Sequence, residues 1–552
     1  MTESSELQSK PESQGGMWLG LVAIVLGTFV SVLNSSLMNV ALTKFVAVFG
    51  SDVQTIQWVI TGYMLASAVV IPMSGFLGAR FGTKTIFLYS VAGFTIGSVL
   101  CGMAWSASSL IMFRILQGIA GGFIMPVGMS IIYSTFPRDK ISTAMGLWGV
   151  AAMVAPALGP TFGGYLIQYY SWRLLFFINI PIGIFAVVMG RILLKETPKK
   201  EGLKFDTLGA VLSITFFGTL LLALSKGQQE GWTSLYIVSL LFVSAASLLL
   251  LIWVELGSPQ PVMDLRIFQN MKFTISVIAS SLVMMGMLGG TFLTPLYLQN
   301  IQSLTAMQTG LVLMPQSVAM ALMMPISGKL FDRFGIIPIG LVGLSVLGIT
   351  TMDLHHLTTD TPRFWLEAVL TVRGMAIGLC MMPLTTAGMM SVKPQQVGNA
   401  SPLSNVCRQV AGSMGIAIFT VIMSDRQIVH GQHITESVSV DNFFASDTIS
   451  ALAGSVYQWG IDMSTATGAA TSVLAGIIQK EAMTRAIADT FYISAVPAFL
   501  CIPFLFFLHT RKKAASAPAD GAAAKAPEAG DALKPDAPKP DAPKPVLEPV
   551  KA

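Results

Sequence analysis

Charged side chains are scarce in this sequence. Asp, Glu, Lys and Arg make up 11% of its 552 residues, whereas hydrophobic residues make up 53%. A soluble domain usually carries about 25% charged residues, so the composition alone predicts an integral membrane protein rather than a soluble globular one. We expect the lipid bilayer to be its surroundings and expect no nucleic-acid partner.

Cysteine and histidine are also few. The four cysteines lie apart in apolar runs, and no pair has the spacing of a redox or metal site, so we interpret them as small buried hydrophobes. The five histidines form no ligand cluster. No segment resembles a P-loop, so direct use of ATP is not expected. We therefore expect no metal, no cofactor and no catalytic residue.

Long apolar runs dominate what is present. A membrane-spanning helix needs about 20 mostly apolar residues. The sequence contains fourteen such runs, and a very short loop joins the seventh to the eighth, which predicts a helical hairpin in the middle of the chain. The predicted spans are 17–42, 55–77, 84–104, 108–135, 141–168, 174–194, 207–225, 233–255, 273–299, 306–328, 336–356, 364–391, 397–424 and 487–509.

Lysine and arginine alternate between rich and poor connections along the chain. Cytoplasmic loops of membrane proteins carry an excess of these residues. With the N-terminus in the cytoplasm, the cytoplasmic connections hold most of them, beginning with Arg80 and Lys84. We therefore expect a multi-pass protein with both termini in the cytoplasm. The short external loops hold only Lys44, Arg173, Lys226 and Arg363.

Two segments fall outside the regular pattern. The external connection at about 425–486 is long but contains helix-compatible stretches, and both a gating or capping hairpin and a loose loop are compatible with it. Residues 511–552 are rich in Pro, Ala and Lys, which predicts a disordered cytoplasmic tail. A solvated tail and a partner-binding tail both fit that composition.

A short repeat divides the chain into two halves. The stretches GFLGARFG (75–82) and GKLFDRFG (328–335) share the pattern G-x-L-x-x-R-F-G, and each follows a span at its cytoplasmic end. Glycine permits the sharp reversal that a tight turn between spans requires. We predict that these turns act as cytoplasmic gates, through Gly75, Arg80, Gly82 and Lys84 in the first copy and Gly328, Asp332, Arg333 and Gly335 in the second.

The repeat predicts a two-bundle organisation, because six spans precede the central hairpin and six follow it. Internal repeats with a binding site between them are typical of secondary transporters. The predicted parts are an N-terminal tail (1–16), a six-helix bundle (17–205), the inserted hairpin (206–256), a second six-helix bundle with the long external loop (257–510) and the tail (511–552).

Several motifs, taken in order, resemble the major facilitator superfamily and in particular its fourteen-span drug:proton antiporter family. LIMFRILQGIAGG (110–122) is similar to the family's span-four motif, and GVAAMVAPALGPTFGG (149–164) to its span-five antiporter motif. QWVITGYMLA (57–66), SWRLLFFINIPIG (171–183) and VGNASPLSNVCRQVAGSMGIA (397–417) resemble spans two, six and thirteen. The resemblance covers about residues 17–510 and implies an all-α polytopic membrane protein with the major facilitator fold.

The span-five motif is predicted to bend its helix. Proline removes a helical hydrogen bond and glycine lets neighbouring helices approach closely, so a hinge is plausible in a transporter that alternates between two states. Ordinary small-residue packing between membrane helices is the competing interpretation. The residues concerned are Gly149, Pro156, Gly159, Pro160, Gly163 and Gly164.

Arginines lie deep in the predicted spans. Arg114 in span four and Arg373 in span twelve occupy similar places in the two halves. A charge at that depth is costly unless it is paired or hydrated, so each marks a functional site by default. Arg408 in span thirteen is compatible with a structural role as well. Trp58 and Tyr63 would add aromatic surface to a substrate cavity.

Carboxylates, in contrast, are missing where the resemblance implies them. Related antiporters carry an acid in span one, where this chain has Asn34, and another in the first glycine-rich turn, where it has Ala79. Spans one to five contain no Asp or Glu at all. Glu367, about two turns before Arg373, is the best proton-carrier candidate, although it could equally be an interfacial acid.

The sequence therefore predicts a secondary active exporter of hydrophobic or amphiphilic small molecules. The proton gradient would supply the energy, with coupling altered because Asn34 and Ala79 replace the usual acids. A bacterial inner membrane is implied by the resemblance alone, which leaves a periplasmic adaptor protein open as a partner. The alternatives are a facilitator or exporter of one neutral or anionic lipid-like metabolite, and a transporter-like membrane sensor or assembly partner.

Overall fold

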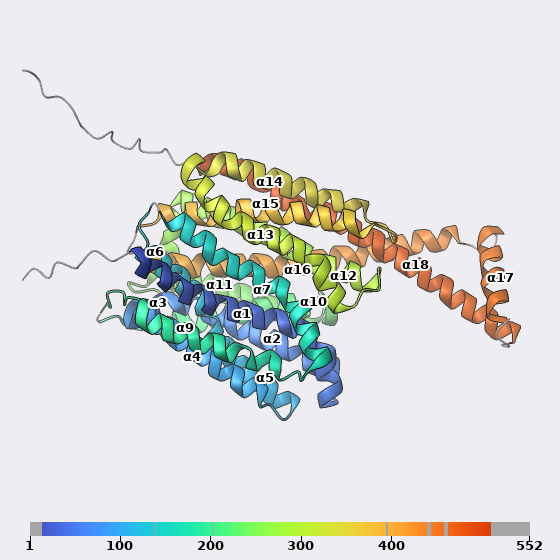
Figure 1. The fold of residues 1–552 in the computed structure, drawn as a ribbon, viewed down its shortest axis with the longest axis horizontal. Helices are drawn as coiled ribbons and strands as arrows, with labels where there is room; N and C mark the ends of the chain where they lie inside the picture. Colours follow the sequence, from blue (N-terminus) through green and yellow to red (C-terminus); the bar gives the residue numbers. More distant parts are fainter. Residues whose placement is uncertain are drawn as a thin grey trace, which may run out of the picture. The chain divides into compact units, whose positions relative to one another are not determined.

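The computed structural model describes residues 14–138, 140–200, 202–393, 396–438, 443–457 and 462–508. All regular elements within these ranges are helical (Figure 1), as the sequence predicts. Most of the predicted N-terminal tail and the whole predicted C-terminal tail lie outside the described residues.

The first half of the chain and the central hairpin form eleven α-helices. They are α1 (Gln14–Phe49), α2 (Val53–Val70), α3 (Met73–Phe81), α4 (Thr83–Gly102), α5 (Ala107–Gly121), α6 (Ile124–Thr135), α7 (Ile141–Tyr169), α8 (Leu174–Phe177), α9 (Asn179–Leu193), α10 (Thr207–Glu230) and α11 (Leu235–Gly257).

The second half contains, among the described residues, eight further α-helices and two short 3-10 helices. They are η1 (Leu265–Gln269), α12 (Met271–Asn300), α13 (Ala306–Phe334), α14 (Ile336–Asp353), η2 (Leu354–His356), α15 (Arg363–Ser391), α16 (Val397–Ser437), α17 (Phe443–Tyr457), α18 (Met463–Ser494) and α19 (Val496–Phe507).

Thirteen helical segments in the described ranges are long and apolar enough to cross a membrane. A fourteenth is α7, whose parts 141–156 and 161–169 meet at an angle of 42° and together make one span. Some spans consist of two successive helices, such as α5 with α6 and α18 with α19. The prediction of an all-α, fourteen-span membrane protein is therefore confirmed.

The long connection at 425–486 is helical over most of its described residues, which favours a hairpin over a loose loop. Helix α16 continues to Ser437, α17 follows, and α18 already begins at Met463. Helices α17 and α18 pack on each other through a small cluster of buried alanines: Ala453, Ala466 and Ala470. Figure 1 shows the pair projecting from one end of the helical bundle.

The two halves join along a broad seam. Helix α7 of the first half packs on both α1 and α13, and α16 of the second half packs on α3 and α6. The hairpin of α10 and α11 attaches through α10 to α2 and α16. One cluster of buried apolar side chains runs through both halves, from Phe87 and Trp148 to Phe273 and Met382.

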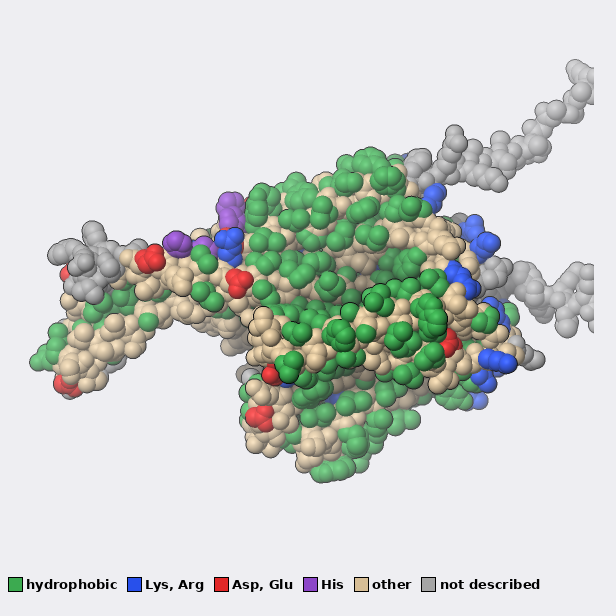
Figure 2. Space-filling view, turned by 180° about the vertical axis from the view of Figure 1, so that it is seen from behind, with side chains coloured by type: hydrophobic (Ala, Val, Ile, Leu, Met, Phe, Trp, Pro, Cys, Tyr) green, Lys and Arg blue, Asp and Glu red, His purple; other side chains and the backbone are tan. Residues whose placement is uncertain are grey.

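The ends of the bundle differ in charge. Figure 2 shows Lys and Arg side chains gathered at one end, with histidines and acidic side chains at the end from which α17 and α18 project. We call the first the basic end. It holds the connections that carry Arg80, Lys84, Arg191, Lys329 and Lys393.

The two halves approach each other closely at the basic end. A β-carbon on Gly75 of α3 would lie 2.9 Å from the carbonyl oxygen of Gly398 in α16, and one on Gly328 of α13 would overlap the carbonyl oxygen of Ser142 in α7. Only glycine permits such backbone contact. The structure is therefore closed at the basic end.

Candidate functional site

A chain of buried polar side chains crosses the first half at the level of Asn34. Asn179 in α9 donates from Nδ2 to Oδ1 of Asn34 over 3.2 Å, and the same Nδ2 lies 3.4 Å from Oγ of Ser98 in α4. Gln117 in α5 donates from Nε2 to Ser98 Oγ over 2.6 Å and accepts from Nη1 of Arg114 over 2.8 Å. These five side chains, all fully buried, form what we call the Asn34–Arg114 chain.

The Arg114 guanidinium is held by neutral groups. Its Nε donates to the carbonyl oxygen of Val59 over 3.0 Å, and its Cζ lies 4.1 Å from the ring centroid of Tyr63. The hydroxyls of Tyr63 and Ser31 lie 3.3 Å apart. In the part of the chain that the structure describes, no ion pair involves Arg114. A cationic group thus sits in a membrane-spanning bundle with only amide, carbonyl and aromatic partners.

Three members of this chain were missed by the sequence reasoning. Gln117 could have been found, because it follows Arg114 by three residues and residues so spaced are neighbours on a helix surface. Ser98 and Asn179 lie in apolar runs with no pattern of their own. They join the site because α4 and α9 pack against each other and α9 packs against α1.

Arg373 occupies a comparable place in the second half. It is fully buried, donates from Nε to Thr351 Oγ1 over 3.0 Å, and has Nη2 at 3.4 Å from the carbonyl oxygen of Gly286. Its Nη1 is buried and lacks a hydrogen-bond partner. Gly290 gives the guanidinium its room, because a β-carbon there would overlap it. The second half therefore also buries a cation among neutral groups.

Glu367 and Trp58 form no ion pair or side-chain hydrogen bond with these arginines within the described residues. Glu367 is half-buried on α15, and no ion pair joins it to Arg373 among the described residues. Trp58 is half-buried and its ring centroid lies 6.0 Å from Nζ of Lys226 in α10. Trp58 thus faces the inserted hairpin, whereas Tyr63 lies with Arg114.

The bend in α7 coincides with the span-five motif. It falls between Pro156 and Thr161, the stretch that contains Gly159. The carbonyl oxygen of Pro156 accepts a hydrogen bond of 2.8 Å from Ser36 Oγ in α1. A β-carbon on Gly159 would overlap Ser36. The bend in α7 is therefore hydrogen-bonded to Ser36 of α1, which follows Asn34 by two residues.

The other motif glycines pack against three neighbouring helices. A β-carbon on Gly163 would lie 3.1 Å from Leu37 of α1, and one on Gly164 would lie 3.5 Å from Met307 of α13. A β-carbon on Gly149 would lie 2.6 Å from Cε of Met382 in α15 and 2.8 Å from Sδ of Met324 in α13. Close packing and a bend are therefore both present, and Pro160 belongs to the bent stretch.

The first glycine-rich turn is capped from a distant segment. Gly82 has φ +95°, and the Glu196 carboxylate accepts from the backbone N–H of Lys84 over 3.0 Å and of Thr85 over 3.1 Å. Lys84 Nζ donates to the carbonyl oxygen of Arg191 over 2.8 Å. Glu196 therefore places a negative charge at the N-terminus of α4, where the helix dipole favours it.

The same segment also covers the end of α3. Arg80 Nη1 donates to the carbonyl oxygen of Leu203 over 3.4 Å, and the carbonyl oxygen of Ala79 accepts from Lys200 N–H over 2.9 Å. Glu196, Lys200 and Leu203 thus hold the turn in place although position 79 carries no acid.

The second glycine-rich turn has a similar backbone. Gly335 has φ +80°, and Arg333 has its Cζ 5.2 Å from the ring centroid of Phe334. Asp332 and Arg333 each interact with neighbouring groups. Together with Gly328 at the seam, this turn resembles the first one in having a glycine with positive φ at the same position of the repeat.

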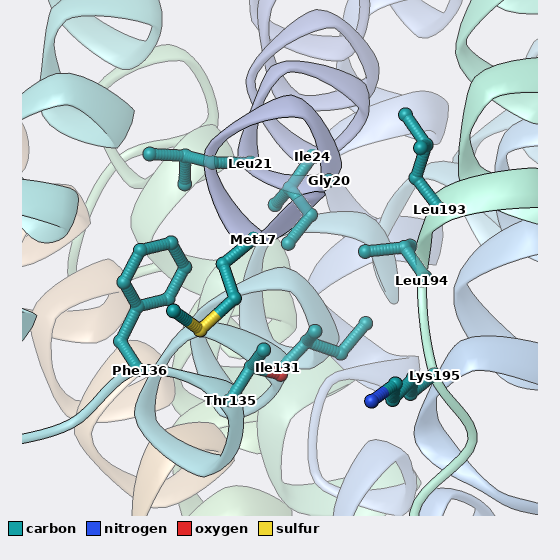
Figure 3. Close-up of a pocket in the computed structure, with 10 residues that line it drawn as sticks. All are labelled: Met17, Gly20, Leu21, Ile24, Ile131, Thr135, Phe136, Leu193, Leu194 and Lys195. Atoms are coloured by element: carbon teal, nitrogen blue, oxygen red, sulfur yellow. The ribbon is translucent and has the colours of Figure 1, made fainter. Parts of the chain in front are cut away.

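A small apolar pocket lies elsewhere, near the basic end of α1 (Figure 3). Its cavity volume is about 10 Å³, room for one water molecule. None of the predicted site residues lines it. The lining residues are Met17, Gly20, Leu21, Ile24, Ile131, Thr135, Phe136, Leu193, Leu194 and Lys195.

Comparison with known proteins agrees with this architecture. The family model described as Major Facilitator Superfamily matches residues 24–416. The chain is 36% identical over 419 residues to the uncharacterized MFS-type transporter YhcA of Bacillus subtilis, which covers 76% of this chain and 79% of the relative. It is 33% identical over 452 residues to the multidrug export protein EmrB of Escherichia coli, covering 81% of this chain and 88% of EmrB.

Two solved structures share the fold. The human organic anion transporter MFSD10 superposes with a TM-score of 0.55 at 12% identity, covering 88% of this chain and 99% of the other. The proton:xylose symporter XylE superposes with a TM-score of 0.57 at 11% identity, covering 90% and 96%. These similarities confirm the all-helical fold, and the family match identifies a membrane transporter rather than an enzyme. The chain belongs to the Major Facilitator Superfamily.

Proposed function

We propose that this protein is a secondary active exporter of hydrophobic or amphiphilic small molecules that works by alternating access. Relatives that share most of its length are named as multidrug export proteins in several bacteria. The bend in α7 and the glycine contacts of α7 with α1 and α13 supply a flexible joint next to the seam. Rocking of the two bundles about that joint would expose the interior to each side in turn.

The orientation is inferred from charge. The basic end faces the cytoplasm, because Lys and Arg are favoured on that side of a membrane. Both termini then lie in the cytoplasm of a bacterial inner membrane, and α17 and α18 face outward. Under this assignment the closed basic end corresponds to a state that is shut toward the cytoplasm.

The observation that carries the proposal is the Asn34–Arg114 chain. It links α1, α9, α4 and α5 by buried polar contacts, although each polar group buried in a membrane bundle is costly. Asn34, at one end of this chain, lies two residues before Ser36, whose hydroxyl is hydrogen-bonded to Pro156 at the α7 bend. A substrate that contacts Asn34 or Arg114 would therefore act directly on the joint.

We infer that the proton gradient supplies the energy and that coupling is altered. Asn34 cannot take up a proton in the working pH range, and Ala79 removes a second acid. Glu367 remains the candidate proton carrier because it is half-buried on the helix that carries Arg373. Glu367 lies about two turns of α15 away from Arg373, so protonation of Glu367 would act on the buried arginine only indirectly.

A facilitator or an exporter of one neutral or anionic lipid-like metabolite is the second candidate. Arg114 and Arg373 both lack an acidic partner in the described ranges, which favours it. The projecting helices α17 and α18 and the similarity to EmrB favour a third candidate function. In it, the protein acts as a membrane sensor or joins a periplasmic adaptor. Deleting 443–457 and, separately, 514–552 while measuring transport would distinguish that role.

The proposal is tested by transport into liposomes under an imposed pH gradient. We expect gradient-driven transport of a cationic dye to be weak and transport of an anionic amphiphile to be stronger, and expect Glu367→Gln to abolish the gradient dependence of both. Asp360→Asn, which neutralises an exposed acid at the same end of the bundle, should leave transport unchanged. Transport that is indifferent to the pH gradient would rule out proton coupling.

A further inference from the structure

The C-terminal end of α10 carries two adjacent glutamines that reach opposite halves of the molecule. Gln228 donates from Nε2 to Oγ of Ser424 in α16 over 3.0 Å. Gln229 donates from Nε2 to Oε1 of Gln57 in α2 over 2.9 Å. Helix α2 belongs to the first half and α16 to the second. One end of the inserted hairpin is therefore hydrogen-bonded to both halves.

The hairpin itself fixes the orientation of both amides. Trp232 Nε1 donates to Gln228 Oε1 over 3.4 Å, and Lys226 Nζ donates to Gln229 Oε1 over 3.3 Å. An indole N–H and an ammonium group can only donate, so each Oε1 is the atom turned toward the hairpin. Each Nε2 is thereby directed outward, to α16 in one case and to α2 in the other. Glutamines that merely solvated a helix end would not need such internal partners.

Helix α10 also packs on α2 and α16 through apolar side chains. Side chains of all three helices line one narrow gap that leaves no room for a water molecule. The packing is close, because Phe217 of α10 is 4% exposed and Val406 of α16 is 3% exposed. Helix α10 thus lies between α2 and α16 on this side of the seam. The side chains around the gap include Ala68, Phe217, Leu221, Val406 and Val410.

The beginning of α10 is attached to the first half at the basic end. The ring of Phe205, just before the N-cap Asp206, packs edge-on against the ring of Phe76 in α3, with centroids 5.2 Å apart. Residues 200 and 203 of the same connection are hydrogen-bonded to the turn at 79–80. Because α10 starts there, its C-terminal glutamines lie toward the opposite end of the bundle.

At that opposite end, α10 has more contacts with the first half than with the second. Lys226 Nζ lies 6.0 Å from the ring centroid of Trp58 in α2, in addition to the hydrogen bond from Gln229. In the described ranges one side-chain hydrogen bond joins α10 to α16, between Gln228 and Ser424. We therefore expect α10 to move with the first half, and the contact with Ser424 to be the one that separates.

We propose that Gln228 and Ser424 form a latch, opposite the basic end, that separates when the basic end opens. Opening at the basic end turns the two halves relative to each other, and such a rotation repacks the contacts between them. The latch therefore stabilises the arrangement that is closed at the basic end. It deepens the proposed export function, and it rests on alternating access only for its consequence in transport.

The latch is tested by hydrogen–deuterium exchange of the purified full-length protein in phosphatidylcholine nanodiscs. Gln228→Ala removes the donor to Ser424 at an exposed position, so we expect the variant to fold like the wild type. Exchange of residues 141–150 and 324–334, at the basic end of the seam, should become about two- to threefold faster. This is the lower range for one net hydrogen bond, because water competes for the exposed amide. Exchange equal to that of the wild type would overturn the proposal.

A double-mutant cycle shows whether the two side chains act as a pair. Ser424→Ala should accelerate exchange of the same two segments as much as Gln228→Ala does. The variant with both changes should add nothing further, since the contact is already lost. Fully additive effects would contradict a latch between these two side chains.

The neighbouring glutamine supplies the matched control. Gln229→Ala should leave the exchange of both segments unchanged, because α10 remains attached to the first half through Phe205 and Lys226. An acceleration equal to that in Gln228→Ala would show that α10 separates from α2 instead, and would refute the assignment of Ser424 as the moving partner.

Cross-linking gives the converse test. Gln228→Cys and Ser424→Cys, joined by a bifunctional methanethiosulfonate, prevent the latch from separating. We expect exchange of the two basic-end segments to become slower than in the wild type, and a reductant to restore it. The same bridge between Gln229→Cys and Gln57→Cys should leave exchange unchanged, because α10 and α2 move together. Three of the four native cysteines are buried, so the wild type treated with the reagent is the control.

Transport is a separate measurement. The bridge between positions 228 and 424 should stop transport of radiolabelled dodecanoate in liposomes, whereas the bridge between positions 229 and 57 should not. Transport by the first bridged protein at the unbridged rate would mean that the latch does not separate, and would overturn the proposal. Because exchange is measured without substrate or gradient, a wild type that transports nothing would refute the export function while the exchange results still decide the latch.

Discussion

Asn34 is a neutral amide at a buried position of a membrane-spanning helix, and its surroundings show how it is tolerated. Its Oδ1 accepts from Asn179, while its own Nδ2 and the Oδ1 of Asn179 are buried without partners. The pair is thus only half satisfied. An amide here avoids the larger cost of a buried carboxylate, and it also leaves Arg114 without a nearby counter-charge.

Asn34→Asp is expected to increase transport of a cationic dye. The carboxylate keeps the acceptor for Asn179, removes the unpaired Nδ2 donor, and adds a negative charge to the Asn34–Arg114 chain. An interaction with a charged group contributes about 1.5–3 kcal/mol, so a gain of about tenfold is expected in initial rate in liposomes.

Asn300→Asp is the matched control, because it adds the same charge at an exposed helix end. We expect it to leave the rate of dye transport unchanged. A rate for Asn34→Asp that equals or falls below the wild-type rate would show that the negative charge at this position is not what favours cations.

At the scale of single elements, the start of α4 is capped by a carboxylate from a distant segment. Glu196 lies on the connection between α9 and α10 and caps α4, more than a hundred residues earlier in the sequence. Its carboxylate lies at the first glycine-rich turn, for which the resemblance implies an acid at position 79 instead. The basic end of the first bundle is thus held by a connection that no motif marks.

Glu196→Ala should loosen the start of α4. Loss of a capping side chain costs about 0.5–2 kcal/mol, and the negative charge at the helix N-terminus is lost as well. Hydrogen–deuterium exchange of residues 83–88 should become faster, whereas Glu230→Ala, at the exposed C-terminal end of α10, should leave it unchanged. Unchanged exchange in Glu196→Ala would mean that the cap contributes nothing.

Helix α18 offers a test that depends on pH. Its N-cap Asp462 accepts hydrogen bonds from Thr465 N–H and Oγ1 and from Ser464 Oγ, and these bonds hold the pKa of the Asp462 carboxyl well below its usual range. A lowered pKa means that the stabilisation is complete above the ordinary pKa of aspartate, about 3.9, and is lost as pH falls through the lowered value.

Asp462→Asn should therefore speed hydrogen exchange in residues 463–470 by the same factor at every pH above about 5. The wild type should approach the variant only in strong acid, as the carboxylate becomes protonated. A difference between the two proteins that already shrinks between neutral pH and about pH 5 would contradict the lowered pKa.

At the scale of the whole molecule, glycine contacts close the seam at the basic end. Gly75 and Gly328 belong to the two copies of the repeated turn, yet each meets the opposite half, at Gly398 and Ser142. The repeat thus places equivalent glycines where the halves must come together. Helix α7 contains both Ser142, which meets Gly328 at the seam, and the bend between Pro156 and Thr161. Closure and bending therefore involve the same helix.

Gly328→Ala should open this seam, because its β-carbon would overlap the backbone of Ser142. Overpacking of this kind costs about 1–3 kcal/mol. We expect faster hydrogen exchange in residues 141–150 and 324–334. Gly257→Ala, where a β-carbon would meet no atom within 4 Å, should leave the exchange of both segments unchanged. Protection in Gly328→Ala equal to that of the wild type would exclude a closing role for this contact.

Local composition determined much of this protein. Apolar runs predicted the spans, because a helix that faces lipid must be apolar along its length. The glycines at 82 and 335 predicted the sharp turns, and both adopt positive φ. The prolines and glycines of span five predicted a bend where α7 changes direction by 42°. These features depend on residues that are close in the sequence.

Only the tertiary structure decided which polar groups meet. Ser98, Gln117 and Asn179 reach Asn34 and Arg114 because four helices pack together, and Arg408 of α16 reaches Thr385 because α15 and α16 are in contact. The roles of Glu367 in coupling and of Trp58 in the cavity stay predictions; Trp58 has Nζ of Lys226 in α10 beside its ring. Hydropathy and motif spacing carry no information about such pairs, because a polar side chain in a span is satisfied by whatever helix folds against it.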